Sequence, residues 1–225
     1  MKAKDSKELW LSIEQKIQPG ETVLGRYTTE AYQLDPIRLS FITSRYKFCA
    51  RMLCGLENVL EIGCGDAFGS MIVAQMVGEL ACTDINETLL DESKERLKHF
   101  KNVRFEYFDF RSNSYPQEMD AVYLIDTIEH IYPDEEPDFM RHLSASLKKH
   151  GVCMIGTPNA TADKYANKWS RLGHVNLKDH ASLMKLARSH FQNAFFFGQN
   201  DEMVHTGFPA MTHFMWALCI GPKRT

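Results

Sequence analysis

The stretch Val59-Leu60-Glu61-Ile62-Gly63-Cys64-Gly65-Asp66-Ala67-Phe68-Gly69 joins an apolar segment to a glycine-rich turn. Residues 58–62 fit a buried strand, and residues 70–77 fit the helix that follows it. Glycines at 63 and 65 let the backbone bend sharply and let a ligand lie against it, at the strand end where open α/β sheets bind ligands. The stretch therefore predicts a strand, turn and helix that hold a ligand.

Along the rest of the middle of the chain, short apolar runs alternate with amphipathic segments that have a helical pattern. Two apolar runs near the end, 193–198 and 213–220, lack a helix between them and are expected to pair in antiparallel fashion. The alternation predicts an α/β fold with a seven-stranded sheet, mostly parallel with an antiparallel last strand, and helices on both faces. The other expected elements are strands at 79–83, 103–108, 120–125 and 152–156 and helices at 87–99, 137–149, 160–170 and 178–190.

The segment before the first strand differs from this middle part. Residues 1–57 carry helical patterns, among them an amphipathic stretch at 39–53, and are expected to form an N-terminal helical cap segment. Residues 58–225 are expected to form the main domain, because 225 residues suit a single domain overall. Three tyrosines of the first segment are candidates to close over the ligand: Tyr27, Tyr32 and Tyr46.

Composition narrows the class of protein and its partners. Hydrophobic residues make up 44% of the chain and charged residues 24%, close to the average of globular proteins. The longest uninterrupted apolar run, Phe214 to Ile220, is too short to span a membrane, and the first residues lack the apolar core of a secretory signal. We therefore expect a cytoplasmic protein. A net charge of −3 gives no general attraction to a phosphate backbone, which disfavours nucleic acid, and the scattered cysteines are expected to be reduced.

The acidic residue Glu61 indicates the charge of the ligand. A carboxylate before the glycines repels a pyrophosphate but suits an ammonium or sulfonium group. The dinucleotide pattern G-x-G-x-x-G also fails, because its third glycine is replaced by Phe68. The turn therefore favours a cationic ligand over NAD.

The ends of the next two strands suggest an adenosine. Asp84 ends the second strand, where an acid can accept hydrogen bonds from a ribose diol, and Ile85 beside it can pack on an adenine face. After the third strand, Phe108-Asp109-Phe110 offers an acceptor for the adenine amino group between two rings. Three strand ends thus converge on one nucleoside.

As a set, these motifs resemble those of the class I S-adenosylmethionine-dependent methyltransferases. The matching residues lie within 58–160: Glu61-x-Gly63-x-Gly65, Asp84, Asp109 and Leu124-Ile-Asp-Thr-Ile-Glu-His130, with Ala67 where the family often has a third glycine. The resemblance implies a Rossmann-like fold, S-adenosylmethionine as cofactor and S-adenosylhomocysteine as product. It places Gly63, Gly65 and the intervening Cys64 at the methionine moiety, Asp84 at the ribose, Asp109 at the adenine amine and Asp126 in the cofactor pocket.

Three histidines are candidate proton acceptors or substrate contacts at the same rim: His130, His174 and His205. His130, next to Glu129, can instead be structural or line the pocket, and His174 can instead stabilise a turn. Asp201, Glu202 and His205 form a possible divalent metal site, but acids on a polar loop are usually only solvated, and we assign no metal. Arg45 is expected to be an exposed surface arginine rather than a partner of the cofactor carboxylate.

The fourth-strand motif bears on the methyl acceptor. Family members that methylate adenine amino groups or glutamine amides carry Asp/Asn-Pro-Pro-Tyr/Phe, whereas residues 126–129 read Asp-Thr-Ile-Glu. We therefore expect O-methylation of a small-molecule or sugar/glycan hydroxyl. The alternatives are N-methylation of a small amine, a non-catalytic S-adenosylmethionine-binding module and, with less support, an NAD-dependent oxidoreductase.

Overall fold

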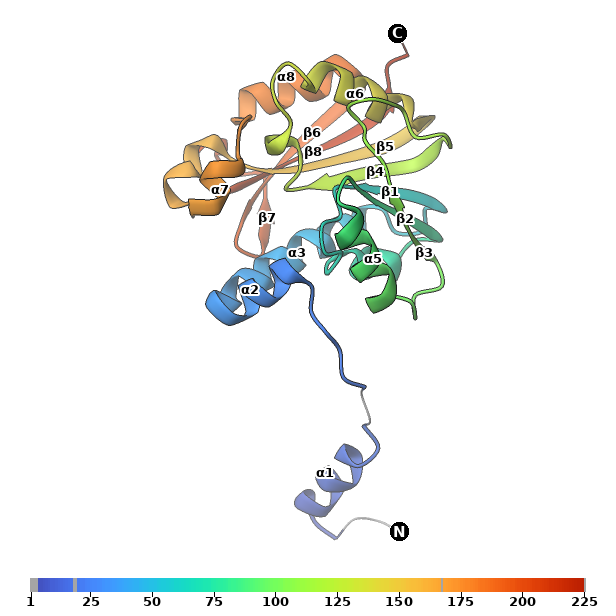
Figure 1. The fold of residues 1–225 in the computed structure, drawn as a ribbon. Coiled ribbons are helices and arrows are strands. Elements are labelled where there is room, and N and C mark those ends of the chain that lie inside the picture. The colour runs from blue at the N-terminus through green and yellow to red at the C-terminus, as the bar shows by residue number, and fades with distance from the viewer. Residues whose placement is uncertain (1–3, 18–19, 167, 225) are drawn as a thin grey trace.

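One eight-stranded sheet organises the chain in the computed structural model, which describes residues 4–17, 20–166 and 168–224 (Figure 1). The strand order is β3-β2-β1-β4-β5-β8-β6-β7. Pairs among the first five strands are parallel, whereas β8 pairs antiparallel with β5 and β6, and β6 antiparallel with β7. The strands are β1 (Asn58–Ile62), β2 (Glu79–Asp84), β3 (Val103–Tyr107), β4 (Met119–Ile125), β5 (Leu147–Pro158), β6 (Phe191–Asn200), β7 (Met203–His205) and β8 (Phe214–Pro222).

The predicted sheet is confirmed in its parallel part and in its antiparallel end, with β7 as an additional short strand. The expected helix at 137–149 is shorter, because α6 ends at Ala145 and β5 already begins at Leu147. The helices are α1 (Ser6–Glu14), α2 (Arg26–Leu34), α3 (Pro36–Met52), α4 (Ser70–Ala74), α5 (Glu87–Arg96), α6 (Glu136–Ala145), α7 (Lys168–Gly173) and α8 (His180–His190), with 3-10 turns η1 (Ile128–His130), η2 (Ala160–Tyr165) and η3 (Pro209–Met211).

Strand β4 shows how the sequence builds two cores. Its run of apolar residues alternates in direction, so that Val122 and Leu124 face one side of the sheet and Tyr123 faces the other. The first side is covered by α6 and α8, and the second by α3, α4 and α5, so a parallel strand with two buried faces reads as continuously apolar (Figure 1).

Local signals set the ends of several helices. Asn86 caps α5 by accepting from the backbone N–H of Leu89, and Asp179 forms a capping box with Ser182 at the start of α8. Helix α1, in contrast, buries no side chain. Among the described residues, no helix has the length and apolar content that a membrane crossing needs.

Candidate functional site

The turn after β1 requires glycine at Gly63. Its φ of +74° lies in the left-handed region, and a Cβ at this position would lie 2.5 Å from Oγ1 of Thr127. Gly65, with φ of +55°, donates its N–H to Asp84 at 2.9 Å. The turn therefore brings bare backbone from β1 next to the carboxylate that ends β2.

Asp84 keeps room for a ligand. Its carboxylate accepts from the N–H groups of Gly65 and Asn86, each at 2.9 Å. An ionised carboxylate offers about four acceptor positions, so two remain for hydroxyl groups. Ile85 next to it is 57% exposed, so its side chain is free to cover an apolar ligand face.

The side chain of Glu61 points into the core and not toward the ligand side of the turn, where its position before the glycines would place it. Strand β1 turns the side chain into the core beneath α3 and α4, where it is 1% exposed and accepts a hydrogen bond from the Cys82 thiol. Burial raises the pKa of Glu61. Cys64, only 4% exposed, packs into the same core. An attraction between Glu61 and a cationic ligand stays a prediction. Because the Glu61 side chain is buried, it offers no surface for direct contact with a ligand.

The segment after β3 needs a correction. Phe110 was expected to flank a ligand, but its ring is 2% exposed and packs against Phe108 and Phe139 in the core beneath α6. Asp109 is held by Arg111, whose Nε and Nη2 lie 3.0 and 2.8 Å from its carboxylate oxygens and lower its pKa. An adenine amine at Asp109 would have to share the carboxylate with this guanidinium.

Arg45 is not the exposed residue expected from the sequence. Its guanidinium pairs with Asp126 at 2.7 Å and lies 3.8 Å from the centre of the Phe214 ring, and its side chain is 16% exposed. Asp126 itself, just after β4, has a left-handed φ of +51°. The pair links α3 to the end of β4, next to Thr127 and Gly63.

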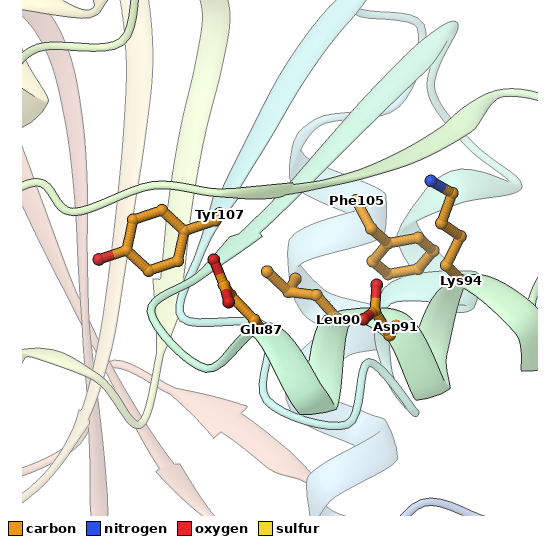
Figure 2. Close-up of a pocket in the computed structure, with 6 residues that line it drawn as sticks. All are labelled: Glu87, Leu90, Asp91, Lys94, Phe105 and Tyr107. Atoms are coloured by element: carbon orange, nitrogen blue, oxygen red, sulfur yellow. The ribbon is translucent and has the colours of Figure 1, made fainter.

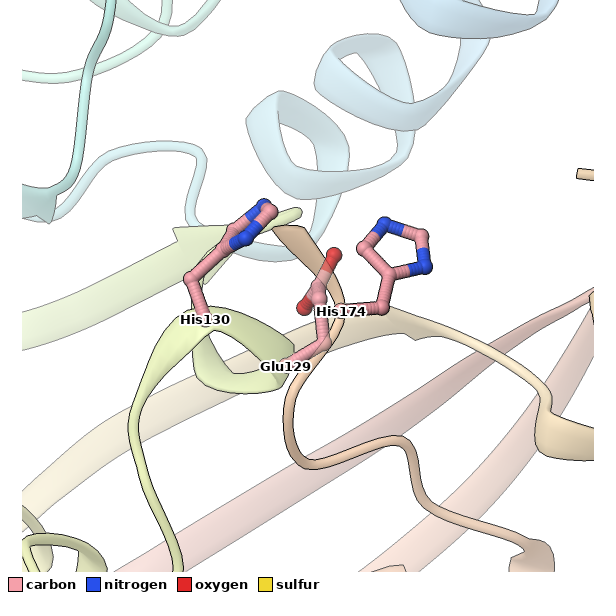
Figure 3. Close-up of side chains that lie close together, drawn as sticks. All are labelled: Glu129, His130 and His174. Carbon is pink, nitrogen blue, oxygen red and sulfur yellow. The ribbon is translucent and has the colours of Figure 1, made fainter. Parts of the chain in front are cut away.

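Glu129, His130 and His174 come together beyond the end of β4 (Figure 3). The first two lie on η1, and the loop after α7 brings His174, because Val175 and Asn176 both donate to the Glu129 carbonyl at 3.0 Å. The rings of His130 and His174 have centres 5.3 Å apart. Two of the three predicted histidines therefore share one small site.

Burial dominates the chemistry of these three groups. Glu129 is fully enclosed, and burial, with Asp126 next in effect, raises its pKa to about 8. Its Oε2 accepts from the Thr157 hydroxyl, whereas Oε1 has no partner. Desolvation, together with His130, lowers the pKa of His174, which favours a neutral ring able to take a proton. Sequence reasoning treated Glu129 as a neighbour of His130, and only its burial reveals it as a central group.

The third histidine lies elsewhere. His205 is on β7, where its Nδ1 accepts from the Gly207 N–H at 3.0 Å. Glu202 on the same hairpin accepts from the Ser40 hydroxyl of α3. Among the described residues, Asp201, Glu202 and His205 do not form a group with the spacing of metal ligands.

The three tyrosines of the N-terminal segment separate. Tyr27 lies over the turn, 3.8 Å from where a Cβ of Gly65 would be, and α2 is tied there because Asp66 accepts from the Thr28 N–H and hydroxyl. Tyr46 is in the core and Tyr32 is exposed, so neither closes over the turn in this structure. Of the three, Tyr27 is positioned to cover a ligand.

Two open pockets of about 300 Å³ lie away from the glycine turn. The first, on edge strand β3 and α5, contains none of the predicted site residues (Figure 2). The second lies between the start of α8 and the segment before β8 and is lined by Asn159, His180 and Phe208 among others. Neither is the cofactor site that the motifs indicate.

The parallel sheet with an antiparallel end, the glycine turn after β1 and the acid at the end of β2 are the features expected of a Rossmann-like S-adenosylmethionine-dependent methyltransferase. Residues 59–151, less than half of the chain, match the family model described as a methyltransferase domain. The described residues fit the cofactor, because Gly63 and Gly65 present backbone without side chains and Asp84 keeps free acceptor positions.

Known proteins with similar sequences or folds agree with this class. A probable S-adenosylmethionine-dependent methyltransferase of Mycobacterium tuberculosis is 26% identical over 107 residues, 47% of this chain and 37% of that protein. A ubiquinone biosynthesis O-methyltransferase of Rickettsia akari is 27% identical over 141 residues, 60% of this chain and 53% of that protein. The chain thus spans roughly a third to a half of these relatives. The N-methyltransferase NodS of Bradyrhizobium japonicum, solved with S-adenosylhomocysteine, shares the fold with a TM-score of 0.63 at 14% identity, over 95% of this chain and 98% of that one.

Proposed function

We propose that the protein transfers the methyl group of S-adenosylmethionine to a hydroxyl of a small-molecule or sugar/glycan-type acceptor. The observation that carries this proposal is the arrangement of two sets of residues along one rim. Gly63, Gly65 and Asp84 form a cradle for the cofactor, and Glu129, His130 and His174 follow the next strand of the sheet.

The cofactor would supply an electrophilic methyl group on a sulfonium. Gly63 and Gly65 would hold its methionine part, Asp84 its ribose, and Tyr27 would cover it. The acceptor oxygen forms the new bond to carbon as the sulfur–carbon bond breaks, and the hydroxyl proton has to leave. His174, whose lowered pKa favours the neutral ring, or His130 beside it, can take this proton.

Support for a hydroxyl acceptor comes from the two neighbouring histidines, because an alcohol loses a proton on methylation and an imidazole can take it. The net charge of −3 supports a small acceptor over nucleic acid. N-methylation of a small amine and a non-catalytic cofactor-binding role are the alternatives. The Rickettsia relative is named as an O-methyltransferase and NodS as an N-methyltransferase, so the names of relatives support either acceptor chemistry.

The test combines cofactor binding with methyl transfer. Calorimetry should show S-adenosylhomocysteine binding that Asp84→Ala weakens roughly 5- to 150-fold, about 1–3 kcal/mol, because the ribose diol loses its charged acceptor. The exposed Asp91→Ala on α5 is the matched control and should bind as the wild type does. Methyl-labelled cofactor should then label hydroxyl compounds in separate pools of alcohols, sugars and amines. Binding without label in any pool would favour the cofactor-binding module, and label confined to amines would favour N-methylation.

A further inference from the structure

We propose that Glu129, His130 and His174 form a binding site for one divalent transition-metal ion. One ligand atom from each residue lies within 4.8 Å of the other two. Three ligands at about 2.0–2.2 Å from a common ion are separated by roughly 3–4 Å, so small side-chain rotations suffice to close the group around an ion. Figure 3 shows the Glu129 carboxylate lying between the two imidazole rings.

An unsatisfied atom points to a missing ligand. Glu129 is 0% exposed, and its Oε1 has no hydrogen-bond partner. A buried polar atom without a partner costs about 1–3 kcal/mol, so its presence in this group needs a physical reason. A cation bound beside Oε1 satisfies it, and Figure 3 shows that His174 turns Nε2 toward Glu129 and His130.

The surrounding contacts are those that orient metal ligands. His130 uses Nδ1 to donate to the Gly173 carbonyl at 2.8 Å, because a carbonyl oxygen only accepts, and its Nε2 therefore carries the free electron pair. Glu129 uses Oε2 to accept from the Thr157 hydroxyl at 2.9 Å, which leaves Oε1 free. Ligating histidines and carboxylates typically hold such outer hydrogen bonds, which fix the ligand and its tautomer.

The backbone is also shaped for a close approach. Gly173 lies against the His130 ring, where an added Cβ would be 3.1 Å from Nδ1 and Cε1. Hydrogen bonds from Val175 and Asn176 to the Glu129 carbonyl fix the loop that carries His174. The nearby guanidinium of Arg45 is neutralised by Asp126, so it does not oppose a bound cation with a free charge.

The ligand set selects the kind of ion. Two imidazoles and one carboxylate suit Zn²⁺, Co²⁺ or Fe²⁺ better than Mg²⁺ or Ca²⁺, which prefer oxygen ligands. Three protein ligands leave at least one position open. The proposed methyl transfer uses His174 or His130 as a base, and a ring nitrogen bound to the ion cannot take a proton, so a bound ion and a histidine base are alternative states of these residues.

Equilibrium dialysis of the chelator-stripped chain against Co²⁺ or Zn²⁺ tests the site. We expect one ion per chain, and at least about 100-fold weaker binding in His174→Ala and His130→Ala, since loss of an outer partner alone costs about 10–100-fold. Thr157→Val should give that smaller loss. His150→Ala, an exposed histidine on β5, should bind as the wild type does. No stoichiometric ion, or equal affinity in wild type and His174→Ala, would overturn the proposal.

Two further measurements keep the result clear. X-ray absorption of the Zn²⁺-loaded wild type should show two imidazole ligands, and a spectrum without imidazole would also overturn the site, even if a variant failed to fold. S-adenosylhomocysteine binding is measured on the same samples. A chain that binds the metal but not S-adenosylhomocysteine counts against the proposed methyl transfer alone. A chain that binds S-adenosylhomocysteine but no metal counts against the metal site alone.

Discussion

The fold encloses the carboxyl group of Glu129 completely and gives it one hydrogen bond, from the Thr157 hydroxyl. Its pKa rises from an ordinary value of 4.5 to about 8, mainly because burial disfavours the charged form. The folded chain therefore holds a proton that the unfolded chain releases between these two pH values. The free energy of unfolding should accordingly fall as the pH rises from about 4.5 to 8, by about 1.4 kcal/mol for each unit of pKa difference.

Glu129→Gln should remove this part of the pH dependence, because an amide does not titrate. Urea unfolding of both chains at several pH values, in the presence of a chelator, measures it. The buried amide should make the variant comparatively more stable at pH 8 than at pH 5. Parallel stability curves for the two chains would show that Glu129 titrates normally.

At Gly63 the loss of stability caused by an added side chain has two sources, backbone strain and steric overlap with Thr127, and these can be measured separately. Gly63→Ala should lower the free energy of unfolding by roughly 2–4 kcal/mol, because the left-handed φ of +74° is joined by a contact of 2.5 Å to Thr127. Gly55 is the matched control, with a φ of +83° and no atom within 4 Å of an added Cβ. Gly55→Ala should therefore cost only about 1 kcal/mol. Equal losses would mean that Thr127 moves aside and that no close approach constrains the turn.

At the scale of elements, helix α2 depends on the glycine turn for its own cap. Gly25 offers no side-chain cap, and the Thr28 N–H in the first turn of α2 is instead satisfied by Asp66 at 2.9 Å. Asp66→Ala should leave this N–H unpaired and release α2 from the turn, at about 1–3 kcal/mol. Limited proteolysis should then cut residues 20–34 faster.

Asp66→Asn tests whether the acceptor is what matters. Its amide oxygen still accepts from Thr28, so cleavage should stay close to that of the wild type. Equal cleavage of Asp66→Ala and wild type would show that packing, for example of Tyr27 over Gly65, holds α2 without the hydrogen bond.

Elements with a period in their sequence could be predicted, and contacts between distant segments could not. The apolar runs of β1, β4 and β8 locate the sheet, because strands buried on both faces need them. In contrast, Arg45 looks like a surface residue until α3 brings it against Asp126 and Phe214. His130 and His174 were both predicted as site residues, but their meeting with a buried Glu129 depends on a loop that hydrogen-bonds across 46 residues, from Val175 to Glu129.

At the scale of the whole molecule, the sheet separates two cores that differ in what they support. The core beneath α3, α4 and α5 includes Cys64 and Cys82, encloses the side chain of Glu61 and lies directly under the glycine turn. The core beneath α6 and α8 includes Cys153 and Cys219 and supports β4, β5 and the antiparallel strands. We therefore expect cofactor binding to stabilise the core under the glycine turn first, whereas both cores must open when the chain unfolds.

The cysteines report on this arrangement because all six are free thiols and only Cys54 is exposed. A thiol reagent should modify one cysteine quickly in the native chain and all six in denaturant. The other five should react only after opening, since burial also raises the pKa of Cys82 and Cys153 and keeps them as thiols. Cys54→Ala should abolish the fast reaction. If the core with Cys64 and Cys82 opens locally, S-adenosylhomocysteine should slow the modification of these two thiols more than that of Cys153 and Cys219. If all five buried thiols are exposed only by global unfolding, the ligand should slow their modification equally. A second fast thiol in the native chain would show that one of the two cores is open without the ligand.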